Sequence, residues 1–97
     1  MKFVQVIEWD SSKRDEMQKL SDEWEAAIGA DSKAVRRVMC EDRDRPGHYV
    51  NIVFFDSYEE AMENSDHPVT QEFSQKMTAL TDGPAKFYNL DVIEEKG

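Results

Sequence analysis

The stretch HYVNIVFFDSYEEAMENSDHPVTQEF (residues 48–73) decides the fold of this chain. It opens with the most apolar strand pattern in the sequence, over residues 48–55. One face of that strand carries Tyr49, Asn51, Val53 and Phe55, and the other carries His48, Val50, Ile52 and Phe54. Ser57 with Glu60 three residues later predicts the start of a helix. The corner SDHP at 65–68 interrupts the helical pattern, because proline fits the first turn of a helix but not its interior.

The elements on either side of this stretch predict a sheet that surrounds the strand. Residues 2–9 are apolar on both faces, which indicates a central strand covered on both sides. Residues 15–28 have amphipathic helical spacing, with a capping box at Ser12 and Asp15 and a stop near Gly29. Residues 33–41 predict a strand nearer an edge, and 85–93 predict the last strand.

The order strand, helix, strand, strand, helix, strand is the split βαβ pattern. It predicts an α+β, ferredoxin-like βαββαβ fold: a four-stranded antiparallel sheet with two helices on one face. We expect residues 1–97 to form a single domain, because a chain of this length holds only one core. The other sheet face is also apolar and needs a partner. The simplest partner is a second copy, so we expect a homodimer that packs its open sheet faces together.

Composition limits the classes of partner. The chain has 21 acidic and 12 basic residues and a formal net charge of −9. An acidic surface argues against nucleic acid and anionic membranes, although solubility is the simpler reason for the charge. Glu8 and Asp10 interrupt the stretch where a signal peptide would be apolar, and no run is long enough to cross a bilayer. We therefore expect a soluble, cytoplasmic protein, with its single cysteine, Cys40, as a small core residue.

From residue 50 onward, VNIVFFDSYEEAMENSDHPVTQEF resembles the dimeric α/β-barrel superfamily, in particular its branch similar to antibiotic biosynthesis monooxygenases. The shared pattern is an apolar strand, an acidic residue and serine, a helix with alanine, a short break and a helix with a buried aromatic residue. The resemblance implies a dimeric α/β barrel with a ligand cavity between sheet and helices. The superfamily includes cofactor-independent monooxygenases, heme-degrading enzymes and muconolactone isomerases, so the fold does not choose the activity.

Heme degradation is the activity that the sequence disfavours. The heme-degrading members carry a tryptophan near the end of the third strand and a histidine on the second helix. This chain resembles them in neither respect: Phe55 stands at the tryptophan position, and His67 lies more than a turn too early. No histidine pairs with an acidic residue at ligand spacing, so we expect no metal site.

The resemblance implies that one face of the first and third strands lines the cavity. Asn51 is expected there to orient a substrate carbonyl or phenol, and the alternative is a buried amide satisfied by neighbouring backbone. His67 is the candidate for proton transfer, because histidine titrates near neutral pH. The alternative, which the sequence favours, is a locally hydrogen-bonded residue at the start of a helix. Tyr49 completes the predicted catalytic set.

The predicted substrate-contacting set consists of Gln5, Trp9, Phe55, Trp24 and Tyr88. For the aromatic residues the alternative is a place in the hydrophobic core, and this alternative is favoured for Trp24. Arg36 and Arg37 are candidates for binding a carboxylate, although ion pairs with the acidic surface are favoured. The resulting hypothesis is a homodimer that binds an aromatic or polyketide-like molecule and acts as a monooxygenase without metal, flavin or other cofactor. A non-catalytic ligand-binding or structural dimer is the alternative, and a lactone-processing isomerase is a third possibility.

Overall fold

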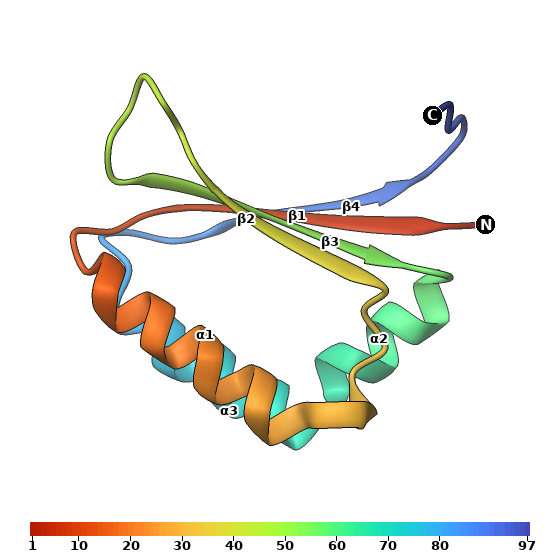
Figure 1. The fold of residues 1–97 in the computed structure, drawn as a ribbon, viewed down its shortest axis with the longest axis horizontal. Coiled ribbons are helices and arrows are strands. Elements are labelled where there is room, and N and C mark those ends of the chain that lie inside the picture. The colour runs from red at the N-terminus through yellow and green to blue at the C-terminus, as the bar shows by residue number, and fades with distance from the viewer.

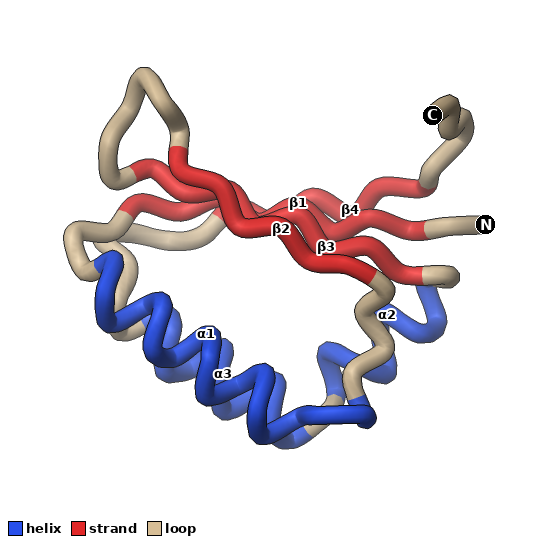
Figure 2. The backbone as a smooth tube through the Cα atoms, in the orientation of Figure 1, coloured by secondary structure: helices blue, strands red, loops and turns tan.

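The structure is a computed structural model that describes residues 1–97. Figure 1 shows a single sheet with all of the helices on one side of it, and Figure 2 shows the same separation of helices from strands. In chain order the elements are β1 (Phe3–Asp10), α1 (Arg14–Ile28), a short 3-10 turn η1 (Gly29–Asp31), β2 (Arg36–Glu41), β3 (His48–Phe55), α2 (Tyr58–Asp66), α3 (Pro68–Thr78) and β4 (Lys86–Asp91). The predicted ferredoxin-like arrangement is confirmed.

The sheet has the strand order β2-β3-β1-β4, and every neighbouring pair is antiparallel. The two most apolar strands, β3 and β1, therefore lie in the centre. Ile7 of β1 lies opposite Asn51 on one side and Phe87 of β4 on the other. Asn51 in turn lies opposite Met39 of β2. Because side chains alternate along each strand, these four residues form one row on the same face.

The buried core on the helix-covered face divides into separate clusters. One cluster joins Phe3, Val53 and Phe55 to Ala61 of α2. Another joins Trp9, Tyr49 and Met17, and the side chain of Met17 is completely buried. Trp9 donates its indole N–H to the Met17 sulfur at 3.0 Å, which links the end of β1 to α1. Helix α3 lies alongside α1 (Figure 1) but has no fully buried residue.

The predicted helix break is confirmed in detail. Ser57 accepts a hydrogen bond from the Glu60 N–H at 3.2 Å and begins α2. His67 has an extended conformation between α2 and α3, and Pro68 is the first residue of α3. The second helical run is therefore a separate helix, since proline cannot continue the i to i−4 hydrogen-bond ladder.

Two local predictions were wrong. Lys13, and not Ser12, precedes the first residue of α1, and no side chain caps that helix. The neighbouring hydroxyl of Ser11 accepts the Lys13 N–H at 3.0 Å and donates to the Leu80 carbonyl at 2.6 Å, so it links the chain before α1 to the residues just after α3. Cys40 is exposed and not part of the core, because it alternates onto the open face of an edge strand. None of the helices is long and apolar enough to span a membrane.

Candidate ligand-binding cavity

A cavity of about 530 Å³ lies between the helix-covered face of the sheet and helices α1 and α3. This volume is in the range of small-molecule sites, which is roughly 300–1,000 Å³. Twenty residues line it. The strands contribute Gln5, Ile7, Trp9, Arg37, Met39, Asn51 and Phe87, and the helices contribute mainly Ser21, Thr70, Phe73, Ser74, Met77 and Thr78. Seven of the twenty lining residues are hydrophobic, and most of the others carry hydroxyl or amide side chains.

The side chains of α3 explain why the space is not filled. Helix α3 presents small or polar residues such as Thr70, Ser74 and Thr78 to the cavity, together with the half-buried Phe73 and Met77. Short hydroxyl side chains cannot reach the sheet across the distance that large apolar residues would span. The core clusters at the ends of the sheet hold the elements apart, and the middle remains open.

Asn51 is the polar group at the centre of the cavity floor. It lies between Ile7 and Met39 in the register of the sheet. Its side-chain oxygen is buried and has no hydrogen-bond partner. The alternative in which this amide oxygen is satisfied by neighbouring backbone is therefore wrong. An unsatisfied buried polar group destabilises a protein by about 1–3 kcal/mol, so Asn51 occupies this position at a cost in stability.

Arg37 is the only charged residue among those that line the cavity. Its Nη2 donates to the Ser21 hydroxyl at 2.7 Å, and its guanidinium carbon lies 5.1 Å from the centre of the Trp24 ring. The predicted ion pairs of Arg36 and Arg37 are wrong, since neither residue takes part in any ion pair of the structure. Arg36 instead lies 5.7 Å from the ring centre of Phe54, so both guanidinium groups pack on aromatic faces.

Gln5 and Trp9 also line the cavity, as the sequence predicted for their strand. Gln5 donates to the side chain of Asn89 at 3.3 Å. The ring of Trp9 stacks on Tyr49 with centroids 5.9 Å apart. Tyr49 itself is 4% exposed and lies outside the cavity lining, where it supports the tryptophan. Burial raises the pKa of the Tyr49 phenol, and the nearby carboxylate of Glu41 raises it further.

The structure places His67 at the start of α3 and not on the cavity. Its Nδ1 accepts the Val69 N–H at 3.1 Å, and its Nε2 lies 3.3 Å from the Asp31 carboxylate. This is the locally hydrogen-bonded position that the sequence favoured for His67. Proton transfer by His67 stays a prediction.

The other predicted contact residues also lie away from the cavity lining. Phe55 is buried in the cluster beneath α2. Trp24 is in the core, where it donates to the Thr70 hydroxyl at 3.2 Å and packs on Phe73. Tyr88 lies on the open face and donates to Glu8 at 3.1 Å. The structure therefore brings together Gln5, Trp9 and Asn51 from the predicted set and separates the rest.

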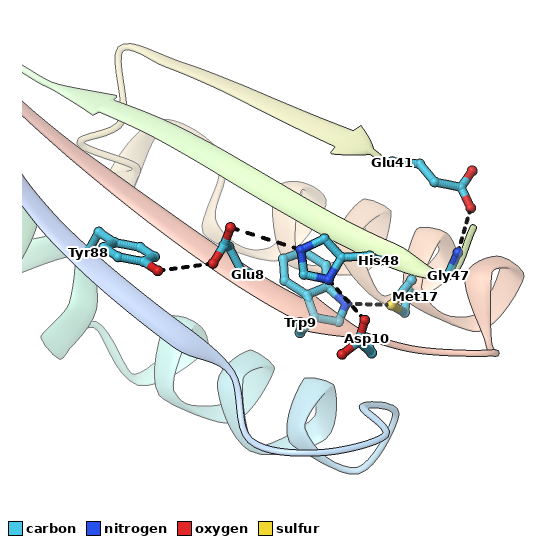
Figure 3. Close-up of polar contacts among 8 residues, drawn as sticks. All are labelled: Glu8, Trp9, Asp10, Met17, Glu41, Gly47, His48 and Tyr88. Carbon is cyan, nitrogen blue, oxygen red and sulfur yellow. Dashed lines mark hydrogen bonds and ion pairs between the residues drawn. The ribbon is translucent and has the colours of Figure 1, made fainter. Parts of the chain in front are cut away.

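The open face carries a polar network at one end of β1 (Figure 3). The imidazole of His48 lies between the carboxylates of Asp10, at 2.9 Å, and Glu8, at 3.9 Å. Glu8 also accepts the Tyr88 hydroxyl. No group of three or more histidine, cysteine or acidic side chains in the structure is arranged to hold a metal ion.

Several cavity residues were not among those predicted. Phe87 and Met39 lie in the same row as Asn51, and only the register of neighbouring strands could have shown this. Phe73 and Met77 lie four residues apart on α3, and apolar residues have this helical spacing whether they face a core or a cavity. Thr70 and Ser74 lie one turn apart on α3, and these two short polar side chains were the feature of the sequence that could have indicated a gap in the packing.

Comparison with protein-family models found no match to the sequence, and comparison with curated proteins found none either. Solved structures do match. SnoaB, a cofactor-independent oxygenase from Streptomyces nogalater, superimposes with a TM-score of 0.81 at 17% identity, over 97% of this chain and 95% of that one. Rv0793 from Mycobacterium tuberculosis gives a TM-score of 0.83 at 15% identity, with both chains covered completely.

A further solved structure, described as an antibiotic biosynthesis monooxygenase, gives a TM-score of 0.77 at 14% identity and covers 97% of this chain and all of that one. Identities this low establish the fold and leave the activity open. The fold that the sequence resemblance predicted is confirmed: this chain has the fold of the proteins similar to antibiotic biosynthesis monooxygenases.

Proposed function

We propose that this protein is a homodimer that binds an aromatic, polyketide-like small molecule in the cavity and oxygenates it without a cofactor. The observation that carries the proposal is the buried side-chain oxygen of Asn51, which has no partner and belongs to a residue on the floor of an apolar cavity. A phenol or enol hydroxyl of a bound ligand would supply the missing donor. Burying an aromatic ring against the walls would supply most of the affinity.

The cavity walls suit a flat ligand. Trp9, Phe73 and Phe87 present aromatic rings, and Met39 and Met77 present flexible thioethers. Aromatic rings pack favourably against both kinds of side chain. A ligand of two or three fused rings would fill a volume of this size and leave the polar groups of the cavity floor able to hydrogen-bond to it.

The proposed chemistry is the oxidation of an anthrone-like substrate. Loss of a proton from the substrate gives an enolate, which reacts with O₂. One oxygen atom then becomes the new carbonyl oxygen at the former methylene carbon, and the other leaves as water. The Asn51 amide would orient the ring oxygen of the enolate in a partly water-excluded site. In this proposal Tyr49 holds Trp9 in place, and the proton passes to solvent, since His67 does not line the cavity.

The open sheet face supports the proposed dimer. Its central row runs across all four strands as Val38, Ile52, Val6 and Tyr88, and the next row contains Phe54, Val4 and Leu90. Leu90 is 46% exposed and Tyr88 is 39% exposed. Soluble proteins rarely leave an apolar sheet face of this kind exposed to water. A second copy related by a twofold axis would cover the face with the same surface of its own sheet.

Two known facts agree with the proposal without establishing it. SnoaB is a cofactor-independent oxygenase and has the same fold. The third strand of this chain also places an amide, Asn51, where the resemblance to that branch implies a substrate-orienting group.

Oxygen consumption with model anthrones and hydroquinones tests the activity. The comparison is between wild type, Asn51→Ala and Gln18→Ala, since Gln18 is an exposed amide on α1 that does not line the cavity. We expect turnover in the wild type and in Gln18→Ala, and a loss of roughly 10²-fold in Asn51→Ala, by analogy with removal of one polar group in a preorganised site. Equal turnover in all three proteins, or none in the wild type, would overturn the oxygenase assignment.

A non-catalytic ligand-binding dimer is the second candidate, and one observation favours it. No residue that lines the cavity can accept or release a proton near neutral pH, because the one charged residue there, Arg37, stays protonated. A general base is therefore absent from the lining itself. Binding of an anthrone analogue, detected by calorimetry, without oxygen consumption would support this second function.

A further inference from the structure

We infer that the ligand of the cavity carries a carboxylate and that Arg37 binds it. This inference rests on the proposed ligand-binding function and narrows its substrate class to aromatic acids. The sequence suggested a carboxylate-binding arginine only as an alternative to surface ion pairs. The structure supplies the position, the surroundings and the unpaired state of one of the two candidates.

The first argument is the missing counter-charge. The chain has 21 acidic residues, yet none of them lines the cavity or pairs with Arg37. Helix α1 faces Arg37 with the neutral hydroxyl of Ser21, although the adjacent positions Asp22 and Glu23 are both acidic and both exposed. A half-buried guanidinium without an acidic neighbour keeps its positive charge available to an anion that enters the cavity.

The second argument is the orientation of the guanidinium. One of its N–H groups donates to the Ser21 hydroxyl, and its guanidinium carbon lies over the Trp24 ring, 5.1 Å from the ring centre. These contacts hold the planar group in place, while its other donors have no acceptor in the protein. Arginine presents two parallel N–H groups to a carboxylate, and a guanidinium that is already positioned loses little entropy when it binds one.

The third argument is the spacing of the polar groups on the floor. Arg37 lies opposite Val53, and Asn51 lies opposite Met39, so Arg37 and Asn51 are diagonal neighbours on adjacent strands. Such diagonal pairs lie about 7–8 Å apart. Gln5 lies on the other side of Val53, so three polar side chains surround one valine. A rigid aromatic ligand with a hydroxyl at one end and a carboxylate at the other matches this arrangement.

Isothermal titration calorimetry with a matched pair of probes tests the inference. The probes are 6-hydroxy-2-naphthoic acid and its methyl ester, which share the ring system and the hydroxyl and differ in the charge. The proteins are wild type, Arg37→Gln, Arg37→Lys and the control Arg36→Gln. Arg36 is the preceding residue, and its substitution removes the same charge from the opposite face of the sheet.

We expect the wild type to bind the acid roughly 10- to 100-fold more tightly than the ester, which is the usual magnitude for a hydrogen bond to a charged group. Arg37→Gln should remove this difference and leave the affinity for the ester unchanged. Arg37→Lys should keep part of the preference for the acid. Arg36→Gln should bind both probes as the wild type does. Rising salt should weaken binding of the acid alone.

Equal wild-type affinity for the acid and the ester would overturn the carboxylate inference and leave the ligand-binding function in place. An equal loss of acid binding in Arg36→Gln and Arg37→Gln would also overturn it, because net charge would then explain the effect. Failure of both probes to bind the wild type would overturn the ligand-binding function itself. If Arg37→Gln does not fold, as judged by circular dichroism, the wild-type comparison and Arg37→Lys decide the question.

Discussion

Arg36 and Arg37 are consecutive residues of β2 whose guanidinium groups pack on aromatic rings on opposite faces of the sheet. Arg37 lies over Trp24 at 5.1 Å on the helix-covered face, and Arg36 lies over Phe54 at 5.7 Å on the open face. Strand alternation thus gives two identical side chains different surroundings. One lines the cavity, and the other lies on the face proposed to meet a second copy.

Replacing Asn51 with leucine should stabilise the protein. The substitution removes a buried oxygen that has no partner and keeps a side chain of similar shape. We expect the free energy of unfolding to rise by about 1 kcal/mol, and Tm by roughly 4–8 °C for a domain of this size. Urea and thermal unfolding measure both. Ligand binding should be lost in the same variant.

Asn64→Leu is the control, because Asn64 is also buried but its oxygen accepts the Lys33 N–H at 2.9 Å. This variant should be destabilised by about 1–3 kcal/mol, since it leaves a backbone donor unpaired. Destabilisation of both variants to the same extent would contradict the interpretation of Asn51.

Met17→Ala should be among the more damaging single substitutions. Met17 is completely buried and accepts the Trp9 indole N–H at 3.0 Å. Truncation to alanine leaves a void and should cost about 2–5 kcal/mol, whereas Met17→Leu should cost less than about 1.5 kcal/mol. Met77→Ala should cost much less than Met17→Ala, because Met77 is only half-buried and already lines a cavity. Denaturant titration followed by tryptophan fluorescence compares the three.

Stability should fall in alkaline solution in a manner that depends on Tyr49. Burial raises the pKa of its phenol in the folded state, so the unfolded chain loses the proton first. The contribution of Tyr49 is therefore complete below its unfolded pKa of about 10 and is lost as pH rises through the folded value. Unfolding of wild type and Tyr49→Phe between pH 8 and 11 should show a steeper decline in the wild type. Parallel curves would contradict this assignment.

Ile52→Asp should convert the proposed dimer into a folded monomer. Ile52 lies on the open face between Val6 and Val38, so an aspartate there would place a charge in the centre of the interface. Light scattering after size exclusion measures the mass, and circular dichroism measures folding. Ile93→Asp is the control, because Ile93 is 92% exposed and follows the last strand. A wild type that is monomeric at micromolar concentration would overturn the dimer.

His67→Ala and Ser57→Ala separate the two possible functions of His67. Each residue accepts a backbone N–H at the start of a helix, so each variant should lose about 1 kcal/mol of stability. We expect the two variants to retain equal turnover, because neither residue lines the cavity. A loss of kcat of roughly 10²-fold or more in His67→Ala alone, with a changed pH profile, would establish proton transfer by His67.

Local patterns in the sequence were sufficient for most of the fold. The alternation in residues 48–55 predicted β3, and the proline corner predicted the boundary between α2 and α3. They were less reliable at the start of α1, where Ser11 uses its hydroxyl for a distant carbonyl and no capping box forms. Cys40 was misplaced for a related reason, since exposure on an edge strand depends on what covers the sheet.

The sequence by itself determined the order of elements, the apolar central strands and the polar side chains that stand out on them, Asn51 and Arg37 included. Each of these features depends only on the spacing and the type of residues that are close together in the chain. Only the tertiary structure decided that Asn51 and Arg37 share a cavity while His67 caps a helix and Tyr88 lies on the opposite face. The reason is physical: strand register and helix packing join residues far apart in the chain, and whether a stripe of side chains encloses a core or a void depends on those contacts.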